Sequence, residues 1–592
     1  MDLVTRNAPA TAQECDALDL VTPARIVDER TVAGDSSRKE QRHLLLEALH
    51  SLQDRIGWIS PSAVDELARR IDVAPAEIFG VASFYALFAL TERPSRQVHA
   101  CIDLACRAVG TRETSLPEGI HPSPCLGLCD QAPAALVVQA GLEPWAELHG
   151  HTDVGALTDL LTASQGVGND AETRRCEGRL VAPQSGDPSL ILLRRVGVVD
   201  PESLGDYRAN GGYLALRRAF ELGPTGIIRE VSDANLIGRG GAGFPAGRKW
   251  EAVGRQPARP HYLVCNADES EPGTFKDRVI MDGDPFALIE SMTIAAYATG
   301  CSKGCIYLRA EYPRAYQRLT HAIEQARRMG LLGTNILGHG FDFDIEIARG
   351  AGAYICGEET AIFNSIEGFR GEPRNKPPFP VEVGLFGKPT LVNNVETLVN
   401  VLPILTMGGA AYSELGTSGS AGLKLFCVSG AVAKPGVYEV EFGVTMRELI
   451  ELAGGIRPGH TMQAVLLGGA AGGYAGPDDL DLPLTFEATR AAGVALGSGV
   501  VMVLDETVNL ADQLVRIAAF FRDESCGQCV PCRVGTVRQQ EVVARLAVGR
   551  SDEDLALLRD LGQVLRDASI CGLGQTAANA IDSAISRLGV FQ

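Results

Sequence analysis

Two groups of cysteines, one near each end of the chain, constrain its fold most strongly. The C-terminal group is Cys526-Gly-Gln-Cys529-Val-Pro-Cys532, with Cys571 further along the chain. Three thiolates at two-residue gaps wrap one corner of a cluster and a distant fourth closes it, which is a common way to hold a [4Fe–4S] centre. Structural zinc also accepts four thiolates but favours two separated pairs, and it remains the alternative.

The N-terminal group consists of Cys101-x4-Cys106 followed by Cys125-x3-Cys129. Two pairs at strand or loop edges could hold a [2Fe–2S] unit with two ligands on each iron. Zinc stays open here too, whereas disulfides are disfavoured in the cytosol. The other seven of the fifteen cysteines show no ligand pattern, and we expect them to pack as small apolar residues; they are Cys15, Cys176, Cys265, Cys301, Cys305, Cys356 and Cys427.

Between the two cysteine groups lies a glycine-rich stretch, residues 238–250, which reads GRGGAGFPAGRKW. Its glycines let the backbone turn where a side chain would collide, so that N–H groups can meet phosphate oxygens. Arg248 and Lys249 follow with positive charge. The spacing also fits the Rossmann fingerprint, but residues 233–237 are short and start polar, and the fingerprint should follow a strand. A plain surface turn therefore remains possible.

Two further stretches have the composition of active-site walls. Residues 266–278 (NADESEPGTFKDR) follow the predicted strand 262–265, and polar residues at the carboxyl end of such a strand lie where α/β folds bind ligands. Residues 350–360 (GAGAYICGEET) combine glycines, an aromatic ring and two acids. Either stretch alone is also typical of a solvated turn.

The composition limits the function. Lys and Arg total 54 against 73 Asp and Glu, and the net charge of −19 argues against binding to nucleic acid. Residues 1–5 lack the basic start of a signal peptide, and no apolar run approaches the roughly 18 residues of a membrane span. We therefore expect a soluble, cytoplasmic protein without a membrane span.

The order of predicted elements indicates a multidomain α/β and α+β protein. After an arm (1–37), helices over 45–56, 60–71 and 75–90 lead into a small α/β unit that ends near residue 165. A linker (166–190) precedes an α/β domain (191–410), which is followed by a small β-grasp domain (411–506) and a helical C-terminal domain (507–592).

Taken together, these motifs resemble a known family. Residues 191–592 resemble the flavin-carrying, NADH-oxidising subunit of respiratory complex I, and residues 38–165 resemble its thioredoxin-like [2Fe–2S] neighbour. Such fusions occur in soluble hydrogenases and in molybdenum- or tungsten-dependent formate dehydrogenases. The segments DESC (523–526), RDASICGLGQ (566–575) and GGY (211–213) look closest to the formate dehydrogenase β subunit.

The resemblance implies that the chain binds one FMN and NAD(H). It also implies one [2Fe–2S] centre held by the N-terminal cysteine group and one [4Fe–4S] centre held by the C-terminal group. It gives Glu271 and Glu359 catalytic positions. The residues that it assigns to FMN or NAD(H) are Gly238, Gly240, Gly241, Gly243, Phe244, Lys249, Asn266, Asp268, Glu271, Tyr354, Gly357, Glu358, Glu359, Phe379, Asn393, Asn394 and Thr397.

The cofactors imply the mechanism. Nicotinamide moves a hydride and iron–sulfur centres accept single electrons, so a flavin, which does both, must lie between them. No molybdopterin or nickel motif is visible, so the second substrate must bind a separate catalytic subunit with its own iron–sulfur chain: a formate dehydrogenase α subunit, or hydrogenase subunits. A zinc-stabilised scaffold with a degenerate nucleotide loop is the alternative from another class.

Overall fold

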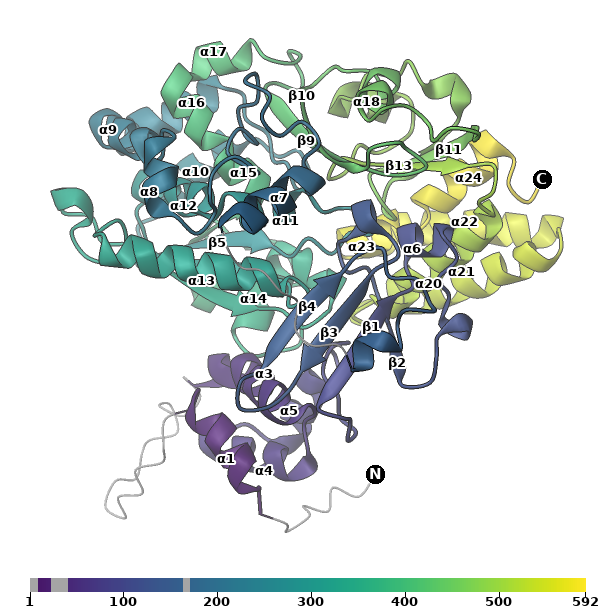
Figure 1. Cartoon of the computed structure of the whole chain (residues 1–592), viewed down its shortest axis with the longest axis horizontal. Coiled ribbons are helices and arrows are strands. Elements are labelled where there is room, and N and C mark those ends of the chain that lie inside the picture. The colour runs from purple at the N-terminus through teal and green to yellow at the C-terminus, as the bar shows by residue number, and fades with distance from the viewer. Residues whose placement is uncertain (1–8, 23–40, 163–170) are drawn as a thin grey trace.

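The computed structural model describes residues 9–22, 41–162 and 171–592 (Figure 1). It begins with a group of helices: α1 (Ala12–Asp19), α3 (Leu45–Ile56), α4 (Pro61–Ile71) and α5 (Pro75–Ala82). Helix α4 begins as the sequence predicts, since Pro61 occupies the first turn and Ser60 Oγ accepts the N–H of Ala63 at 3.0 Å. Leu45, Leu49 and Leu52 are fully buried on one face of α3.

Residues 12–19 of the predicted arm form helix α1. The carboxylate of Glu14 is buried, accepts the N–H of Thr11 at 2.6 Å, and also accepts the hydroxyl of Ser60 from α4. Ser51 of α3 donates to the carbonyl of Ala17 at 2.7 Å. Two turns are too short to show a hydrophobic period, and tertiary contacts stabilise this helix. Residues 1–8 and 23–37 of the predicted arm lie outside the described residues.

The third predicted helix is also shorter than expected, because α5 ends at Ala82 rather than near Leu90. The next segment instead donates backbone hydrogen bonds to a distant loop. The N–H groups of Ala86 and Leu87 reach the carbonyls of Gly352 and Ala351 at 3.2 and 3.1 Å. The backbone of residues 86 and 87 therefore bonds to a distant loop instead of continuing the helix.

The first sheet has the strand order β2-β1-β3-β4. Its strands are β1 (Arg96–Cys101), β2 (Ile120–Ser123), β3 (Ala135–Gln139) and β4 (Trp145–His149), and α6 (Leu104–Ala108) follows β1. Strands β1 and β2 run parallel, with Cys101 opposite Ser123. The two cysteine segments therefore start from the same edge of the sheet.

The second sheet is entirely parallel, with the order β7-β6-β5-β8. Its strands are β5 (His261–Ala267), β6 (Cys301–Leu308), β7 (Asp344–Arg349) and β8 (Thr390–Asn394). The surrounding helices are α8 (Leu204–Ala209), α9 (Leu214–Asp233), α10 (Ala246–Gly254), α11 (Lys276–Gly283), α12 (Pro285–Thr299), α13 (Pro313–Arg328), α14 (Glu359–Ile366), α15 (Val395–Val399), α16 (Val401–Met407) and α17 (Gly409–Ser413). Helix α12 packs on β5 and β6 and is buried on almost every side, as its apolar sequence requires.

Within the predicted linker, residues 171–181 form helix α7 (Ala171–Val181), which packs against α11 (Figure 1). Gly178 lies so close to Gly197 that an added Cβ would stand 2.6 Å from the Gly197 nitrogen. Beyond α7, the carboxylate of Glu439 accepts the N–H groups of residues 191–193 at 2.7–2.9 Å. These long-range contacts lie within and just beyond the predicted linker and attach it to the rest of the fold. Residues 166–170 lie outside the described residues.

The third sheet is mixed, with the order β10-β9-β13-β11-β12. It comprises β9 (Leu423–Gly430), β10 (Gly436–Glu441), β11 (Met462–Leu467), β12 (Gly473–Ala475) and β13 (Val500–Asp505), with helices α18 (Met446–Leu452) and α19 (Phe486–Ala491). Strand β13 is parallel to β9, and the other pairs are antiparallel. Its core forms a separate apolar cluster around Phe426 and Val465.

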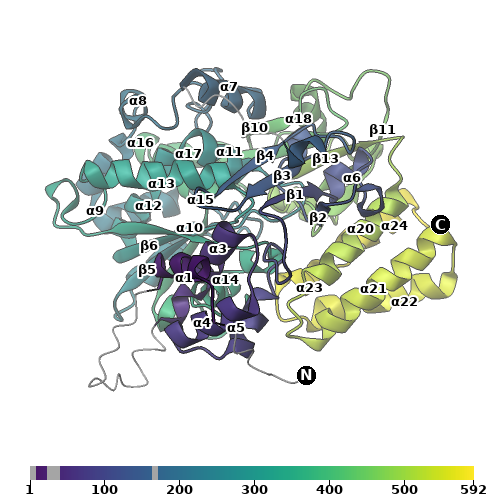
Figure 2. The same cartoon turned by 60° about the horizontal axis from the view of Figure 1, so that its bottom comes forward.

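The C-terminal part consists of helices gathered at one side of the molecule (Figure 2). They are α20 (Leu510–Asp523), α21 (Val530–Val548), α22 (Asp552–Ala568), α23 (Gly572–Thr576) and α24 (Asn579–Leu588). Helix α20 packs against α6 of the first sheet. Short 3-10 helices complete the described structure: η1 (Arg42–Leu44), η2 (Glu113–Ser115), η3 (Cys129–Gln131), η4 (Asp159–Leu161), η5 (Ile336–Gly338), η6 (Tyr354–Gly357), η7 (Leu385–Gly387) and η8 (Pro477–Asp479). Among the described residues, no helix combines the length and the apolar character that crossing a membrane needs.

Candidate active site and cysteine clusters

A cavity of about 760 Å³ opens where the parallel sheet, the mixed sheet and the C-terminal helices meet. Asn266 and Asn394 lie opposite each other at the carboxyl ends of the adjacent strands β5 and β8. This edge of a parallel sheet is the usual ligand-binding edge. The predicted residues that line the cavity are Gly240, Gly241, Asn266, Asp268, Glu271, Tyr354, Gly357, Glu358 and Asn394.

The glycine-rich loop forms one wall and follows helix α9, not a strand, so the Rossmann interpretation does not hold. Gly241 has φ +118°, a conformation that side chains rarely adopt. At Gly240 an added Cβ would lie 3.2 Å from the Cβ of Asn394, so the loop approaches β8 closely. Thr397 is buried and its hydroxyl accepts the N–H of Arg239 at 2.8 Å, which fixes the start of the loop.

The other predicted residues do not line this cavity: they are Gly238, Gly243, Phe244, Lys249, Glu359, Phe379, Asn393 and Thr397. Asn393 is buried and accepts the indole N–H of Trp250 at 2.9 Å. Phe244 and Phe379 are each 52% exposed. Glu359 pairs with Lys249 at 3.2 Å and with Lys376 at 2.8 Å, and these lysines hold its pKa below the ordinary value against the effect of burial.

Half-buried acids from the segment after β5 form another part of the cavity wall. Burial raises the pKa of both Asp268 and Glu271 to about 7. Glu271 accepts the hydroxyl of Tyr354 at 2.6 Å and the N–H of Ala471 at 2.9 Å. The second oxygen of Asp268, Oδ2, is buried without a hydrogen-bond partner in the described structure. An acceptor without a partner on a cavity wall fits a ligand that carries an N–H or O–H donor.

Several wall residues escaped the sequence analysis. Glu269 accepts the N–H groups of Asp277 and Arg278 at 2.8 and 2.9 Å and lines the cavity. Glu269 lies in the stretch 266–278, which the sequence predicts as an active-site wall, but the spacing of residues does not distinguish Glu269 from Asp268. The loop between β11 and β12 of the mixed sheet contributes Gly468, Ala471 and Gly472, and the run GGAAGG (468–473) is the sequence signal for it.

Glu524 joins the C-terminal helices to this wall, because it accepts the N–H of Tyr354 at 2.8 Å. Burial raises the pKa of Glu524 to about 8. The ring of Tyr354 also packs on Phe520, with ring centroids 5.0 Å apart. Glu524 lies two residues before Cys526, so the cavity wall and the C-terminal cysteine segment are in direct contact.

The structure brings together the four N-terminal cysteines, and all four are buried. The sulfurs of Cys125 and Cys129 lie 3.5 Å apart. Hydrogen bonding to Cys106 and Cys125 raises the pKa of Cys101 well above its ordinary value. The four thiols therefore face one common space.

The four C-terminal cysteines also converge. Cys529 is the N-cap of α21 and Cys571 is the N-cap of α23. Burial, with the neighbouring thiols of Cys529, Cys571 and Cys526, raises the pKa of Cys532 to about 12. The fold thus brings Cys571 near the Cys526–Cys532 segment, from which it is far apart in sequence.

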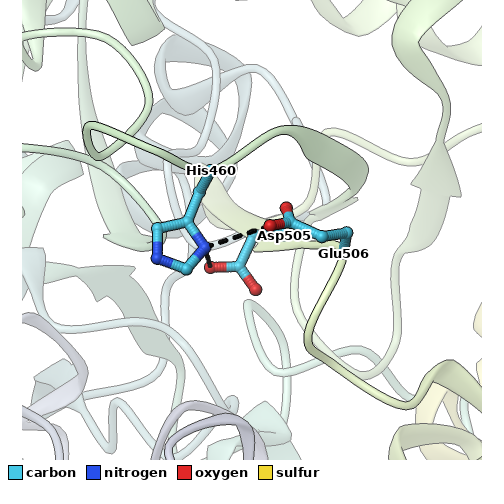
Figure 3. Close-up of side chains that lie close together, drawn as sticks. All are labelled: His460, Asp505 and Glu506. Carbon is cyan, nitrogen blue, oxygen red and sulfur yellow. Dashed lines mark ion pairs between the residues drawn. The ribbon is translucent and has the colours of Figure 1, made fainter.

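Four thiols that face one space can bind a single zinc ion or an iron–sulfur cluster. In a tetrahedral site with Zn–S bonds of about 2.3 Å, the sulfurs lie about 3.8 Å apart. Among the described residues, one group of three potential metal ligands has all its ligand atoms within 4.8 Å of one another. It consists of His460, Asp505 and Glu506 (Figure 3). That trio contains no cysteine. The 3.5 Å between the sulfurs of Cys125 and Cys129 suits two thiolates on one metal, either a zinc ion or one iron of a [2Fe–2S] centre, so the family comparison decides between them.

Comparison with protein families agrees with this chemistry. Residues 231–403 match the Nuo51 FMN-binding domain, and residues 512–588 match the NADH-ubiquinone oxidoreductase-F iron-sulfur binding region. Residues 32–116 match the thioredoxin-like [2Fe-2S] ferredoxin, a match that includes Cys101 and Cys106. Residues 424–503 match the SLBB domain, which is the part with the mixed sheet.

Individual relatives extend the comparison. An F subunit of the NADH-quinone oxidoreductase of Rhizobium meliloti is 46% identical over 398 residues, which are 67% of this chain and 94% of the relative. The HndC subunit of the NADP-reducing hydrogenase of Solidesulfovibrio fructosivorans is 45% identical over 397 residues, 66% of this chain and 80% of the relative. A crystal structure of an NAD+-reducing [NiFe]-hydrogenase is similar with a TM-score of 0.77 and 33% identity, covering 92% of each chain.

The fold and the site thus define a flavin- and iron–sulfur-containing oxidoreductase subunit, and the predicted fold class is confirmed. The chain belongs to the family of the NADH-quinone oxidoreductase F subunits, the NADH dehydrogenase (diaphorase) subunits that carry FMN and a [4Fe–4S] centre. A thioredoxin-like [2Fe–2S] part precedes that unit in the same chain. These matches favour the enzyme over a zinc-stabilised scaffold.

Proposed function

We propose that this chain is the β subunit of an NAD-dependent formate dehydrogenase. The coarser activity, movement of electrons between NAD(H), FMN and iron–sulfur centres, follows from the family. The observation that supports this coarser activity best is that one chain contributes a cavity wall touching the C-terminal cysteine segment, through the contact of Glu524 with Tyr354. The formate assignment depends on the segments DESC (523–526), RDASICGLGQ (566–575) and GGY (211–213), the first of which contains Glu524.

A second candidate is the diaphorase subunit of an NAD-reducing hydrogenase. The similarity to the [NiFe]-hydrogenase structure, which covers 92% of this chain, favours it. In both cases formate or hydrogen would react on another polypeptide, and this chain would exchange electrons with it.

We propose the following roles for the site residues. The glycine loop, Asn266, Asp268 and Asn394 would hold FMN, and Asp268 Oδ2 supplies an acceptor that has no partner within the described structure. Bound FMN supplies the step between two-electron hydride chemistry and one-electron transfer. Glu271 and Glu359 would face the nicotinamide nucleotide, and Phe244 and Phe379 are exposed enough to contact it. The two cysteine groups would be the cluster ligands, and the predicted domain limits are part of the same proposal.

An exposed apolar face beside the C-terminal cysteines supports docking of a partner's iron–sulfur subunit. Val530, Val534 and Val537 follow at helical spacing on α21, with 59%, 49% and 38% exposure. Ile570, next to Cys571, is 43% exposed. Apolar side chains grouped around a redox centre are typical of a surface that a partner covers.

Purification of the tagged chain from its source would test the proposal. Mass spectrometry should identify a subunit with a molybdopterin site, metal analysis should find molybdenum or tungsten, and the complex should reduce NAD+ with formate. The chain alone should oxidise NADH with ferricyanide but should not oxidise formate. A nickel subunit and hydrogen-dependent NAD+ reduction would establish the second candidate instead. Recovery in the cytoplasmic fraction would test the proposed cytoplasmic location.

A further inference from the structure

One buried arginine touches both the cavity wall and the N-terminal cysteine segment. Arg309 directly follows β6 and is 2% exposed. Its Nη1 donates to the carbonyl of Glu269, which lines the cavity, at 2.6 Å. Its Nη2 donates to the carbonyl of Cys125, 184 residues away in sequence. A full positive charge is therefore held beside the Cys125–Cys129 segment.

Within the described structure, this charge has one close carboxylate partner. Nη2 of Arg309 also donates to Glu311 Oε1 at 2.9 Å, and Glu311 is 2% exposed. The second oxygen of Glu311 and the Nε of Arg309 have no hydrogen-bond partner among the described residues. Burial limits screening by solvent, so each charge of this pair acts strongly on its surroundings.

The Cys125–Cys129 segment packs tightly against the residues that follow β6, which include Arg309 and Tyr312. Gly127 has φ +68°, and an added Cβ would lie close enough to clash with the hydroxyl of Tyr312. The Arg309 guanidinium lies 4.8 Å from the centre of the Tyr312 ring. Arg278 also pairs with Asp130, the neighbour of Cys129, at 2.8 Å. The geometry around the segment is thus fixed by several buried contacts.

We infer that Arg309 and Glu311 act in opposite directions on the reduction potential of the [2Fe–2S] centre, Arg309 raising it and Glu311 lowering it. The inference depends on the proposed ligand set of Cys101, Cys106, Cys125 and Cys129. Reduction adds one electron to the centre, and a nearby buried positive charge stabilises the more negative state. Arg309 is a positioning residue in this role, because it acts on the centre through the Cys125 backbone and its electric field.

An EPR-monitored redox titration of the purified full-length chain would test this inference. At the wild-type midpoint, Arg309→Met should lower the ratio of reduced to oxidised [2Fe–2S] about tenfold, which is about 59 mV for one electron. Glu311→Gln should raise that ratio by a similar factor, because it leaves the arginine uncompensated. Arg309→Lys keeps the charge and should stay near wild type. The [4Fe–4S] signal should not shift in any variant.

Arg42→Met is the matched control. Arg42 also donates to a distant backbone carbonyl, that of Gly368 at 3.2 Å, but none of its described contacts is to a cysteine segment. It should leave the [2Fe–2S] midpoint unchanged. If Arg309→Met fails to retain the centre, Glu311→Gln and Arg309→Lys still decide the question.

If Arg309→Met and Glu311→Gln shift the [2Fe–2S] midpoint potential in the same direction, the inference is overturned. A general loosening of the Cys125–Cys129 segment would shift the midpoint in the same direction in both variants. An unchanged midpoint in Glu311→Gln would overturn it too. A wild-type chain with FMN and [4Fe–4S] but without any [2Fe–2S] signal would instead refute the proposed ligand set, and the inference with it.

Discussion

Replacement of Tyr354 by phenylalanine should move the pH dependence of NADH oxidation upward. Burial disfavours the charged form of Glu271 and raises its pKa to about 7, while the Tyr354 hydroxyl, 2.6 Å away, stabilises the carboxylate and lowers it. The substitution removes only this donor, since the N–H of Ala471 still donates to Glu271. The pKa of Glu271 must therefore rise.

The size of the effect follows from the type of hydrogen bond. A hydrogen bond to a charged group contributes about 1.5–3 kcal/mol, and one pH unit corresponds to about 1.36 kcal/mol. The part of the pH profile of NADH oxidation that reports the ionisation of Glu271 should move up by about one to two pH units. The direction is the same whether NADH oxidation needs the ionised or the protonated acid.

The assay is kcat/KM for NADH with ferricyanide, measured across roughly pH 5–10, because kcat/KM reports groups of the free enzyme. Tyr438→Phe is the control: this hydroxyl donates to the backbone carbonyl of Lys434 at 2.6 Å and touches no carboxylate in the described structure. Its profile should match wild type. A Tyr354→Phe profile that coincides with wild type, or moves down, would refute the reasoning. If Glu271→Gln keeps the wild-type limb of the kcat/KM pH profile, that limb reports the ionisation of another acid. Asp268, whose pKa burial also raises to about 7, is then the first to examine.

Three further predictions concern the cofactors and the nucleotide. Metal analysis of the intact chain should give about six irons and no stoichiometric zinc, the sum of one [2Fe–2S] and one [4Fe–4S] centre; zinc in place of iron would contradict both assignments. Cys571→Ser should alter the [4Fe–4S] EPR signal and leave the [2Fe–2S] signal largely intact, because the two groups lie in different parts of the fold; an unaltered [4Fe–4S] signal would mean that the fourth ligand is elsewhere. Glu359→Ala should slow NADH oxidation at least tenfold, a loss of about 1.4 kcal/mol in transition-state binding, while flavin and iron content stay at wild-type levels; oxidation at the full rate would remove Glu359 from the site.

Local chemistry made part of this protein readable from sequence. The Cys526–Cys532 spacing fixes which sulfurs can face a common centre, because a two-residue gap leaves the chain few ways to turn. Ser60 followed by Pro61 marks the start of α4, since a cap and a fixed φ act within one turn. The glycines of residues 238–247 permit a loop such as Gly241 forms, whatever surrounds it.

Tertiary structure decided the rest. Helix α1 begins with a capping box of Thr11 and Glu14, which is a local signal, but its place against α4 depends on the contact of buried Glu14 with Ser60. The cavity wall needs Ala471 and Glu524, which contact Glu271 and Tyr354 across 200 and 170 positions. Arg309 reaches Cys125 only when two parts of the chain pack together. The energy of such contacts comes from burial and pairing between distant residues, so no local pattern in the sequence records them.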